Sequence, residues 1–188
     1  QLGELWVRGS SVIKGYINRP EATAESITDG WLHTGDVAEA CDDGSISLID
    51  RKKDIMINAA GKNLSPSLIE NIMKASPYIK ECIVIADRRP YVSALVQIDM
   101  DTVRLWAESK GIAYTTFRSL AEHPQVVELI DKEVAKQNAN LARVEQIKKV
   151  HLLPKELDHD DGEVTATMKV RRNKVYEFYD AQIEGLYA

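Results

Sequence analysis

The chain contains few of the residues that build disulfide frameworks or metal centres. Its 188 residues include two cysteines, Cys41 and Cys82, and they do not form a Cys-x-x-Cys pair. Its four histidines are scattered, and none lies in a His-Glu-x-x-His motif. The sequence therefore argues against a disulfide-stapled secreted fold and a zinc ribbon, and we predict no metal site within it.

Long apolar runs, a signal-peptide pattern and an initiator methionine are also missing. No run approaches the roughly 20 apolar residues that a membrane-spanning helix needs. The chain opens with the strand-like segment QLGELWVRG, which lacks the features of a secretory leader. We therefore expect a soluble piece of a larger intracellular protein. The predicted location is cytoplasmic, with peripheral contact at the inner face of the membrane left open.

An excess of basic residues is absent as well. Lysine and arginine total 24 against 29 for aspartate and glutamate, which gives a net charge of -5. Broad nucleic-acid binding depends on neutralising phosphates, and RNA-binding sheets carry aromatic strand motifs that this sequence lacks. The glycine-rich phosphate loops GxxxxGK[ST] and GxGxxG do not occur either. We therefore predict no nucleic-acid partner.

What is present is typical of a globular protein, with 44% hydrophobic and 28% charged residues. The first 50 residues predict short strands and turns, a segment too small to bury a core without a partner. The turn Asp42-Asp43-Gly44 predicts a hairpin between residues 37–40 and 46–49. Two further strands are expected at 5–7 and 11–13, and a short helix is expected at 21–27.

From residue 51 onward the pattern predicts a small α+β domain. Ser65 and Pro66 are typical of a helix N-cap and first helical position, and the spacing of apolar residues extends that helix toward Pro77. Helices are also expected from Val103 to a stop at Gly111, from Pro124 with an apolar face that includes Leu141, and from Val175 to Leu186. Strands are expected at 55–57, 79–86, 91–98 and 150–153, and a turn at 59–63.

Two charged segments have ordinary interpretations. The acidic run from Asp158 to Glu163 does not have the spacing of a calcium loop, and we interpret it as a solvated mobile loop. The cations between Lys169 and Lys174 are typical of a basic helix start. Asp36 follows the glycine turn Thr34-Gly35, where a carboxylate can accept the two hydroxyls of a ribose, although a turn-capping aspartate is the commoner explanation.

Several motifs, in order and at matching spacing, carry a resemblance to a known family. They are GELWVRG at 3–9, GY at 15–16 with PEAT at 20–23, DGWLHTGD at 29–36, DRKKD at 50–54, GKNLSP at 61–66 and IE at 69–70. Together they resemble the adenylate-forming family of acyl-CoA synthetases, luciferases and peptide-synthetase adenylation domains. The ending, GEVTATMKVRR at 162–172 with IEGLY at 183–187, is similar to the long-chain and very-long-chain fatty acyl-CoA synthetase branch.

The resemblance implies a domain organisation and a role for individual residues. Residues 1–50 would be the β-rich tail of a large N-terminal AMP-binding domain, and 51–188 the small α+β C-terminal lid, with a hinge near Lys53. Asp36 and Arg51 match the positions that hold the adenosine ribose. Lys169 matches the catalytic lysine of adenylation. The turn Ala59-Ala60-Gly61 would line the passage for pantetheine.

The resemblance also implies the reaction and its substrates. A fatty acid and ATP would give an acyl-adenylate and pyrophosphate, and the acyl group would then pass to CoA with release of AMP. Mg²⁺, the phosphate loop and the acyl tunnel would belong to the missing N-terminal domain, which is an implied partner. We therefore expect the 188-residue chain alone to form no adenylate.

Two positions depart from the branch pattern, and a second interpretation remains open. Ala60 stands where a glycine is usual, which would narrow the pantetheine passage. Ala166 stands where a proline is usual between two threonines, which predicts a slightly looser loop. The alternative is a lid-like interaction or regulatory module without catalysis. Retention of Asp36, Arg51 and Lys169 together favours the enzyme.

Overall fold

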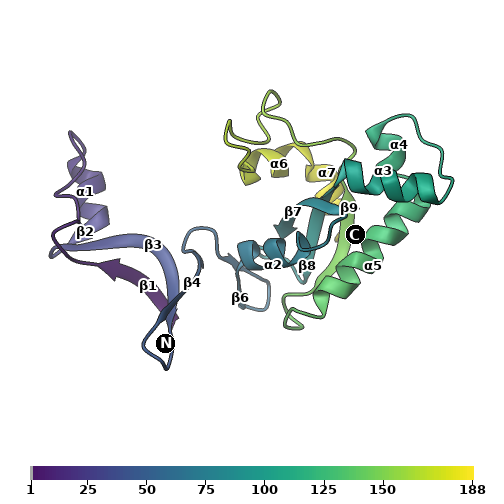
Figure 1. Cartoon of the computed structure of the whole chain (residues 1–188). Helices are drawn as coiled ribbons and strands as arrows, with labels where there is room; N and C mark the ends of the chain where they lie inside the picture. The colour runs from purple at the N-terminus through teal and green to yellow at the C-terminus, as the bar shows by residue number, and fades with distance from the viewer. Residues whose placement is uncertain (1) are drawn as a thin grey trace. The chain divides into compact units, whose positions relative to one another are not determined.

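The computed structural model describes residues 2–188, which divide into two compact units with the boundary in the chain between Ile55 and Met56 (Figure 1). Each unit is described by itself. No helix in the described part of the chain combines the length and the apolar character needed to cross a membrane.

The first unit is a small antiparallel sheet organised around one long strand. Strand β3 (Trp31–Ala40) pairs with β1 (Leu2–Val7), with β2 (Ile27–Thr28) and with β4 (Ile46–Arg51), and the short helix α1 (Pro20–Ser26) precedes β2 (Figure 1). The predicted hairpin and short helix are confirmed. The strand expected at residues 11–13 is wrong, because this segment forms turns and bends.

The first unit buries very little of its own apolar surface. Among its described residues only Val37 and Ala38 are buried. Ile46 and Leu48 on β4 are 57% and 64% exposed, and Trp6 on β1 is 46% exposed. This agrees with the expectation that the segment cannot build a core alone.

The second unit is built on a three-stranded sheet. Strands β7 (Ile79–Ile85) and β8 (Val92–Ile98) form an antiparallel hairpin, and β9 (Ile147–Leu152) pairs with β8 in parallel (Figure 1). A short antiparallel hairpin precedes the sheet in the chain, and its strands β5 (Met56–Ile57) and β6 (Asn63–Leu64) have two residues each. The helices are α2 (Pro66–Met73), α3 (Met100–Ser109), α4 (Phe117–Ala121), α5 (Pro124–Asn138), α6 (Arg172–Phe178) and α7 (Asp180–Gly185).

Hydrophobic residues fill both faces of this sheet. All seven residues of the central strand β8 are buried. Val84 and Val96 belong to a cluster with residues of α2, α3 and α5, whereas Ile83 and Leu95 belong to a second cluster with residues of α6 and α7. Successive strand residues point to opposite faces, so the alternation along β7 and β8 supplies both layers.

The helix boundaries follow local chemistry with three corrections. Ser65 Oγ accepts a hydrogen bond from the Leu68 N–H at 3.2 Å, as its predicted N-cap role requires. The last helix is not continuous, because Tyr179 leaves the helical conformation at φ −110°, ψ 23° and separates α6 from α7. Leu141 lies beyond the end of α5 at Asn138, and the short helix α4, capped by Thr116, was not predicted.

Candidate functional site

The first unit brings Asp36 and Arg51 into direct contact. The two residues are register partners on β3 and β4, and Arg51 Nε lies 2.9 Å from Asp36 Oδ1. A second guanidinium nitrogen of Arg51 donates to the Thr34 carbonyl at 3.2 Å. Asp36 is thus held by strand pairing and Arg51 by two acceptors, which gives the pair a defined geometry.

The glycine turn before Asp36 is fixed by backbone bonds. Gly35 has φ 72°, a left-handed conformation that favours glycine, and its carbonyl accepts from the Lys52 N–H at 2.7 Å. The Thr34 hydroxyl donates to the Leu5 carbonyl at 2.8 Å and accepts from the Asp36 N–H at 3.1 Å. The turn therefore presents Asp36 from a rigid support.

A cavity of about 430 Å³ opens beside this pair, lined by Gly35, Arg51, Lys52 and Lys53. Lys52 is ion-paired with Glu4 at 2.9 Å, and this hydrogen bond lowers the pKa of the Glu4 carboxyl. The cationic lining of the cavity suits an anionic or phosphorylated ligand. Lys53, the predicted hinge residue, lies in this lining.

The turn 58–62 in the second unit is organised by one buried side chain. Asn58 Oδ1 accepts hydrogen bonds from the Ala60 N–H at 3.0 Å and the Lys62 N–H at 2.9 Å. Gly61 adopts φ 73°, and a Cβ there would meet no atom within 4 Å, so conformation rather than space calls for glycine. Ala59, Ala60 and Gly61 are all exposed, and the N–H group of each is hydrogen-bonded within the protein.

Lys169 lies at the end of a small closed hairpin. An antiparallel bridge joins Val164 to Val170, and the Thr165 N–H donates to the Lys169 carbonyl at 2.8 Å. The Lys169 N–H donates to Thr165 Oγ1 at 3.1 Å, and the Met168 N–H donates to the Thr165 carbonyl at 2.8 Å. The hairpin is therefore bonded across its turn although Ala166, and not a proline, lies between Thr165 and Thr167. The Lys169 side chain is exposed.

A polar cavity of about 390 Å³ lies between this hairpin and α2, with Lys169 and Lys74 among its lining residues. Its wall includes a partly buried ion pair in which Arg172 Nη2 lies 2.7 Å from Glu70 Oε1. The Val84 N–H also donates to that carboxylate at 2.8 Å. Burial raises the pKa of Glu70 above its ordinary value, although Arg172 acts in the opposite direction.

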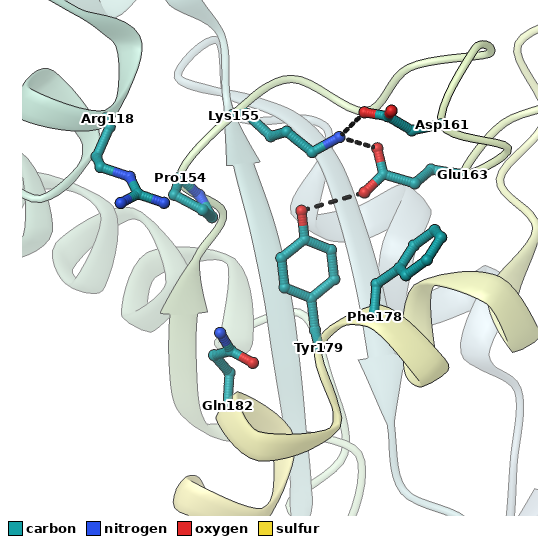
Figure 2. A pocket seen from close by; sticks show the side chains of 8 residues that line it. All are labelled: Arg118, Pro154, Lys155, Asp161, Glu163, Phe178, Tyr179 and Gln182. Carbon is teal, nitrogen blue, oxygen red and sulfur yellow. Dashed lines mark hydrogen bonds and ion pairs between the residues drawn. The ribbon is translucent and has the colours of Figure 1, made fainter.

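The acidic loop corrects one prediction. Its aspartates are exposed, as a solvated loop requires, but Glu163 is only 1% exposed. Its carboxylate accepts hydrogen bonds from Lys155 Nζ at 2.7 Å and Tyr179 Oη at 3.2 Å (Figure 2), and a third from the Asp158 N–H at 3.1 Å. The prediction of a solvated loop is therefore wrong at Glu163. No local pattern reveals this burial, because Lys155 and Tyr179 come from other segments.

The described residues hold no group of three or more histidine, cysteine, aspartate or glutamate side chains arranged to bind a metal ion. A magnesium ion does not fit any carboxylate set described here, and no chemical step below is assigned to one. Asp36 and Arg51 lie in the first unit, whereas Lys169 and the turn 59–61 lie in the second.

The sheet with both faces covered by helices defines the second unit as a small α+β domain, and Lys169 is exposed on a hairpin of this domain. The family described as AMP-binding enzyme C-terminal domain matches residues 53–188, and the chain belongs to this family. The predicted family and fold class are confirmed.

Individual relatives extend the comparison to nearly the whole chain. A Mycobacterium tuberculosis protein, fadD11, whose name describes a fatty-acid–CoA ligase, is 45% identical over 99% of this chain and 33% of its own length. Human long-chain-fatty-acid–CoA ligase 1 is 33% identical over 99% of this chain and 27% of its own length. The chain thus spans about a third or less of these curated relatives.

A solved structure agrees with the fold. The adenylation domain of a carboxylate reductase from Mycobacterium chelonae superposes with a TM-score of 0.79 at 24% identity. The match covers 99% of this chain and 28% of that chain.

Proposed function

We propose that this chain is the C-terminal part of a long-chain fatty acid–CoA ligase. The observation that carries the proposal is the exposed Lys169 on its closed hairpin, at the position that the family resemblance assigns to adenylation. The identity to named fatty-acid–CoA ligases over the whole chain supports the substrate class. Residues 1–50 are then the end of the large domain and residues 51–188 the lid, with the hinge at Lys53.

In the first step an oxygen of the fatty acid carboxylate attacks the α-phosphorus of ATP, and pyrophosphate leaves. Two anions must approach each other, and negative charge grows on the phosphoryl oxygens in the transition state. The Lys169 ammonium neutralises that charge when the hairpin is delivered to the reacting atoms. Asp36 accepts the ribose hydroxyls, and Arg51 holds the Asp36 carboxylate in place. Mg²⁺ is bound by the large domain.

In the second step the CoA thiol attacks the acyl carbonyl carbon of the adenylate, loses its proton, and AMP leaves. The lid rotates between the steps, so Lys169 withdraws and the turn Ala59-Ala60-Gly61 lines the pantetheine passage. The exposure of these three residues supports this role, because a ligand can reach the turn from solvent. The partners of the complete protein are ATP, CoA, a fatty acid and the large domain. Its location is cytoplasmic, with peripheral membrane contact open.

The test uses the complete polypeptide that contains this chain. Lys169→Ala is expected to lower the rate of fatty-acid-dependent ATP–pyrophosphate exchange by about 100-fold or more. CoA transfer from a supplied acyl-adenylate is expected to be retained. Lys174→Ala is the matched control, because Lys174 is a surface lysine paired with Glu177 on α6. Retention of both reactions in Lys169→Ala would remove Lys169 from the chemistry. The 188-residue chain alone is expected to show no exchange.

A further inference from the structure

The buried carboxylate of Glu163 occupies the base of the Lys169 hairpin. It accepts hydrogen bonds from three donors in different segments. Figure 2 shows Lys155, which follows β9, and Tyr179, which lies between α6 and α7; the third donor is the Asp158 N–H in the acidic loop. Figure 2 also shows Asp161 beside Glu163, and its carboxylate lies 2.5 Å from the same Lys155 ammonium. One lysine therefore connects the loop to the buried carboxylate.

This cluster is charged and is held in one arrangement by its partners. A buried carboxylate is stable in a protein only when it is paired and hydrogen-bonded. Partial burial lowers the pKa of Lys155, but its bonds to Asp161 and Glu163 outweigh this and raise the pKa above the ordinary lysine value. Burial and the neighbouring Glu163 raise the pKa of Tyr179 to about 12, so its phenol stays a donor at neutral pH.

The main chain of Glu163 links the buried cluster to the hairpin. Its carbonyl accepts the Arg171 N–H at 2.8 Å, on the strand that returns from the turn. The next pair outward is the Val164–Val170 bridge, and the Thr165–Lys169 bond follows it. Glu163 and Arg171 are thus the pair at which the two arms of the hairpin leave the folded domain, and the position of Lys169 depends on where that pair is held.

We propose that Glu163 is a positioning residue for Lys169: its buried contacts to Lys155 and Tyr179 fix the base of the hairpin, so that the ammonium reaches the adenylation site in one orientation. This inference rests on the proposed function of Lys169. A role confined to fold stability would lower the melting temperature and leave both half-reactions of the folded protein unchanged. A positioning role lowers the adenylation half-reaction alone.

Glu163→Gln tests this with little change in shape. Lys155 and the Asp158 N–H both donate to Oε2, so the amide oxygen can keep these two contacts while the amide NH₂ faces the Tyr179 hydroxyl. The substitution therefore removes the negative charge opposite Lys155 and leaves the other contacts possible. The matched control is Glu177→Gln on α6, where the carboxylate is exposed and pairs with Lys174 at 2.8 Å. Tyr179→Phe, which removes a single bond of 3.2 Å and keeps the Lys155 pair, provides a milder second variant.

Two measurements are needed. In the 188-residue chain, hydrogen exchange of the Thr165, Met168 and Arg171 amides is expected to accelerate in Glu163→Gln and to match the wild type in Glu177→Gln. In the complete polypeptide, assayed well below its melting temperature, kcat of adenylation is expected to fall by about tenfold or more, because small displacements of a positioned group are costly. The rate of CoA transfer from supplied acyl-adenylate is expected to stay within about twofold of the wild-type rate. The adenylation kcat of Tyr179→Phe is expected to lie between those of the wild type and Glu163→Gln.

The outcomes separate this inference from the function on which it rests. If the wild-type polypeptide forms no acyl-adenylate, the proposed function fails, and the exchange data still report whether Glu163 orders the hairpin. If the wild type is active but Glu163→Gln retains full adenylation, or loses both half-reactions equally, Glu163 does not position Lys169. Unchanged exchange of the three amides overturns the inference as well.

Discussion

Arg172 and Glu70 form an ion pair of 2.7 Å that joins helix α6 to helix α2. The hairpin of Lys169 leads directly into α6, and the turn Ala59-Ala60-Gly61 and strand β6 lead into α2. Arg172 and Tyr176 also donate to the Val84 carbonyl of β7, at 3.0 and 2.6 Å. The segments proposed for the two half-reactions are therefore tied to the same strand.

Arg172→Met is expected to destabilise the second unit by about 3 kcal/mol, because it leaves the Glu70 carboxylate poorly solvated and without its cation. Burial already raises the pKa of Glu70, and the loss of Arg172 raises it further. A carboxyl whose pKa is raised in the folded state favours folding below its unfolded pKa and loses that contribution as pH rises through the folded pKa. The deficit is therefore expected to shrink at pH 4 relative to pH 8.

Urea unfolding of the 188-residue chain at the two pH values measures this difference. Arg104→Met is the control, because Arg104 and Glu108 form an exposed pair of 3.9 Å whose loss should cost less than about 0.5 kcal/mol. A deficit of the same size at both pH values would contradict the proposed dependence on Glu70.

Arg51→Lys is expected to raise KM for ATP in the complete polypeptide by about tenfold, with a smaller change in kcat. A lysine cannot contact Asp36 and the Thr34 carbonyl together, because it lacks the forked guanidinium. Steady-state adenylation kinetics provide the measurement. Arg104→Lys is the matched control, and its KM for ATP should equal that of the wild type. An unchanged KM would remove this pair from nucleotide binding.

Ala60→Gly is expected to lower KM for CoA and to leave ATP–pyrophosphate exchange within about twofold, because it removes a methyl group from the proposed pantetheine passage. The glycine should cost about 0.5–1 kcal/mol of stability through the unfolded chain. Kinetics with CoA as the varied substrate test this effect. A KM for CoA equal to that of the wild type would mean that Ala60 does not restrict the passage.

Asp99→Ala is expected to destabilise the second unit by about 1 kcal/mol at pH 7. Asp99 Oδ1 caps α3 by accepting the Thr102 N–H at 3.0 Å and the Thr102 hydroxyl at 2.7 Å, and the hydroxyl bond is the largest cause that lowers the pKa of Asp99. A lowered carboxyl pKa contributes stability above the unfolded value and loses it as pH falls through the folded value. Thermal unfolding should therefore show that the stabilities of the wild type and Asp99→Ala converge near pH 3.

Much of the fold could be predicted because its signals are local. The Ser65–Pro66 start of α2, the β7–β8 hairpin and the start of α5 at Pro124 each depend on residues next to one another in the chain. The break at Tyr179 could not be predicted this way, since apolar spacing continues through it. Its phenol bonds to Glu163, which lies in another segment. Helix α4 was missed because five residues are too few to show a period.

The candidate site also contains residues that the sequence identifies and residues that it does not. Asp36 and Arg51 were named from motif resemblance, and the structure places them in contact, because β3 and β4 pair in that register. Their role in nucleotide binding stays a prediction, as does that of Lys169. The local sequence pattern does not distinguish Glu163 from the exposed aspartates of its loop, since burial of a carboxylate depends on partners from other segments.

The position of β9 has a consequence for the nascent polypeptide during translation. Strand β8 forms its hairpin with β7 early, but its other edge pairs with β9, and residues 99–146 must be synthesised in between. At about 5–20 residues per second, that edge stays open for several seconds. Helices α6 and α7, which cover Ile83 and Leu95, arrive later still. Ribosome-bound intermediates that end before residue 147 should therefore be the stage at which chaperones bind this domain.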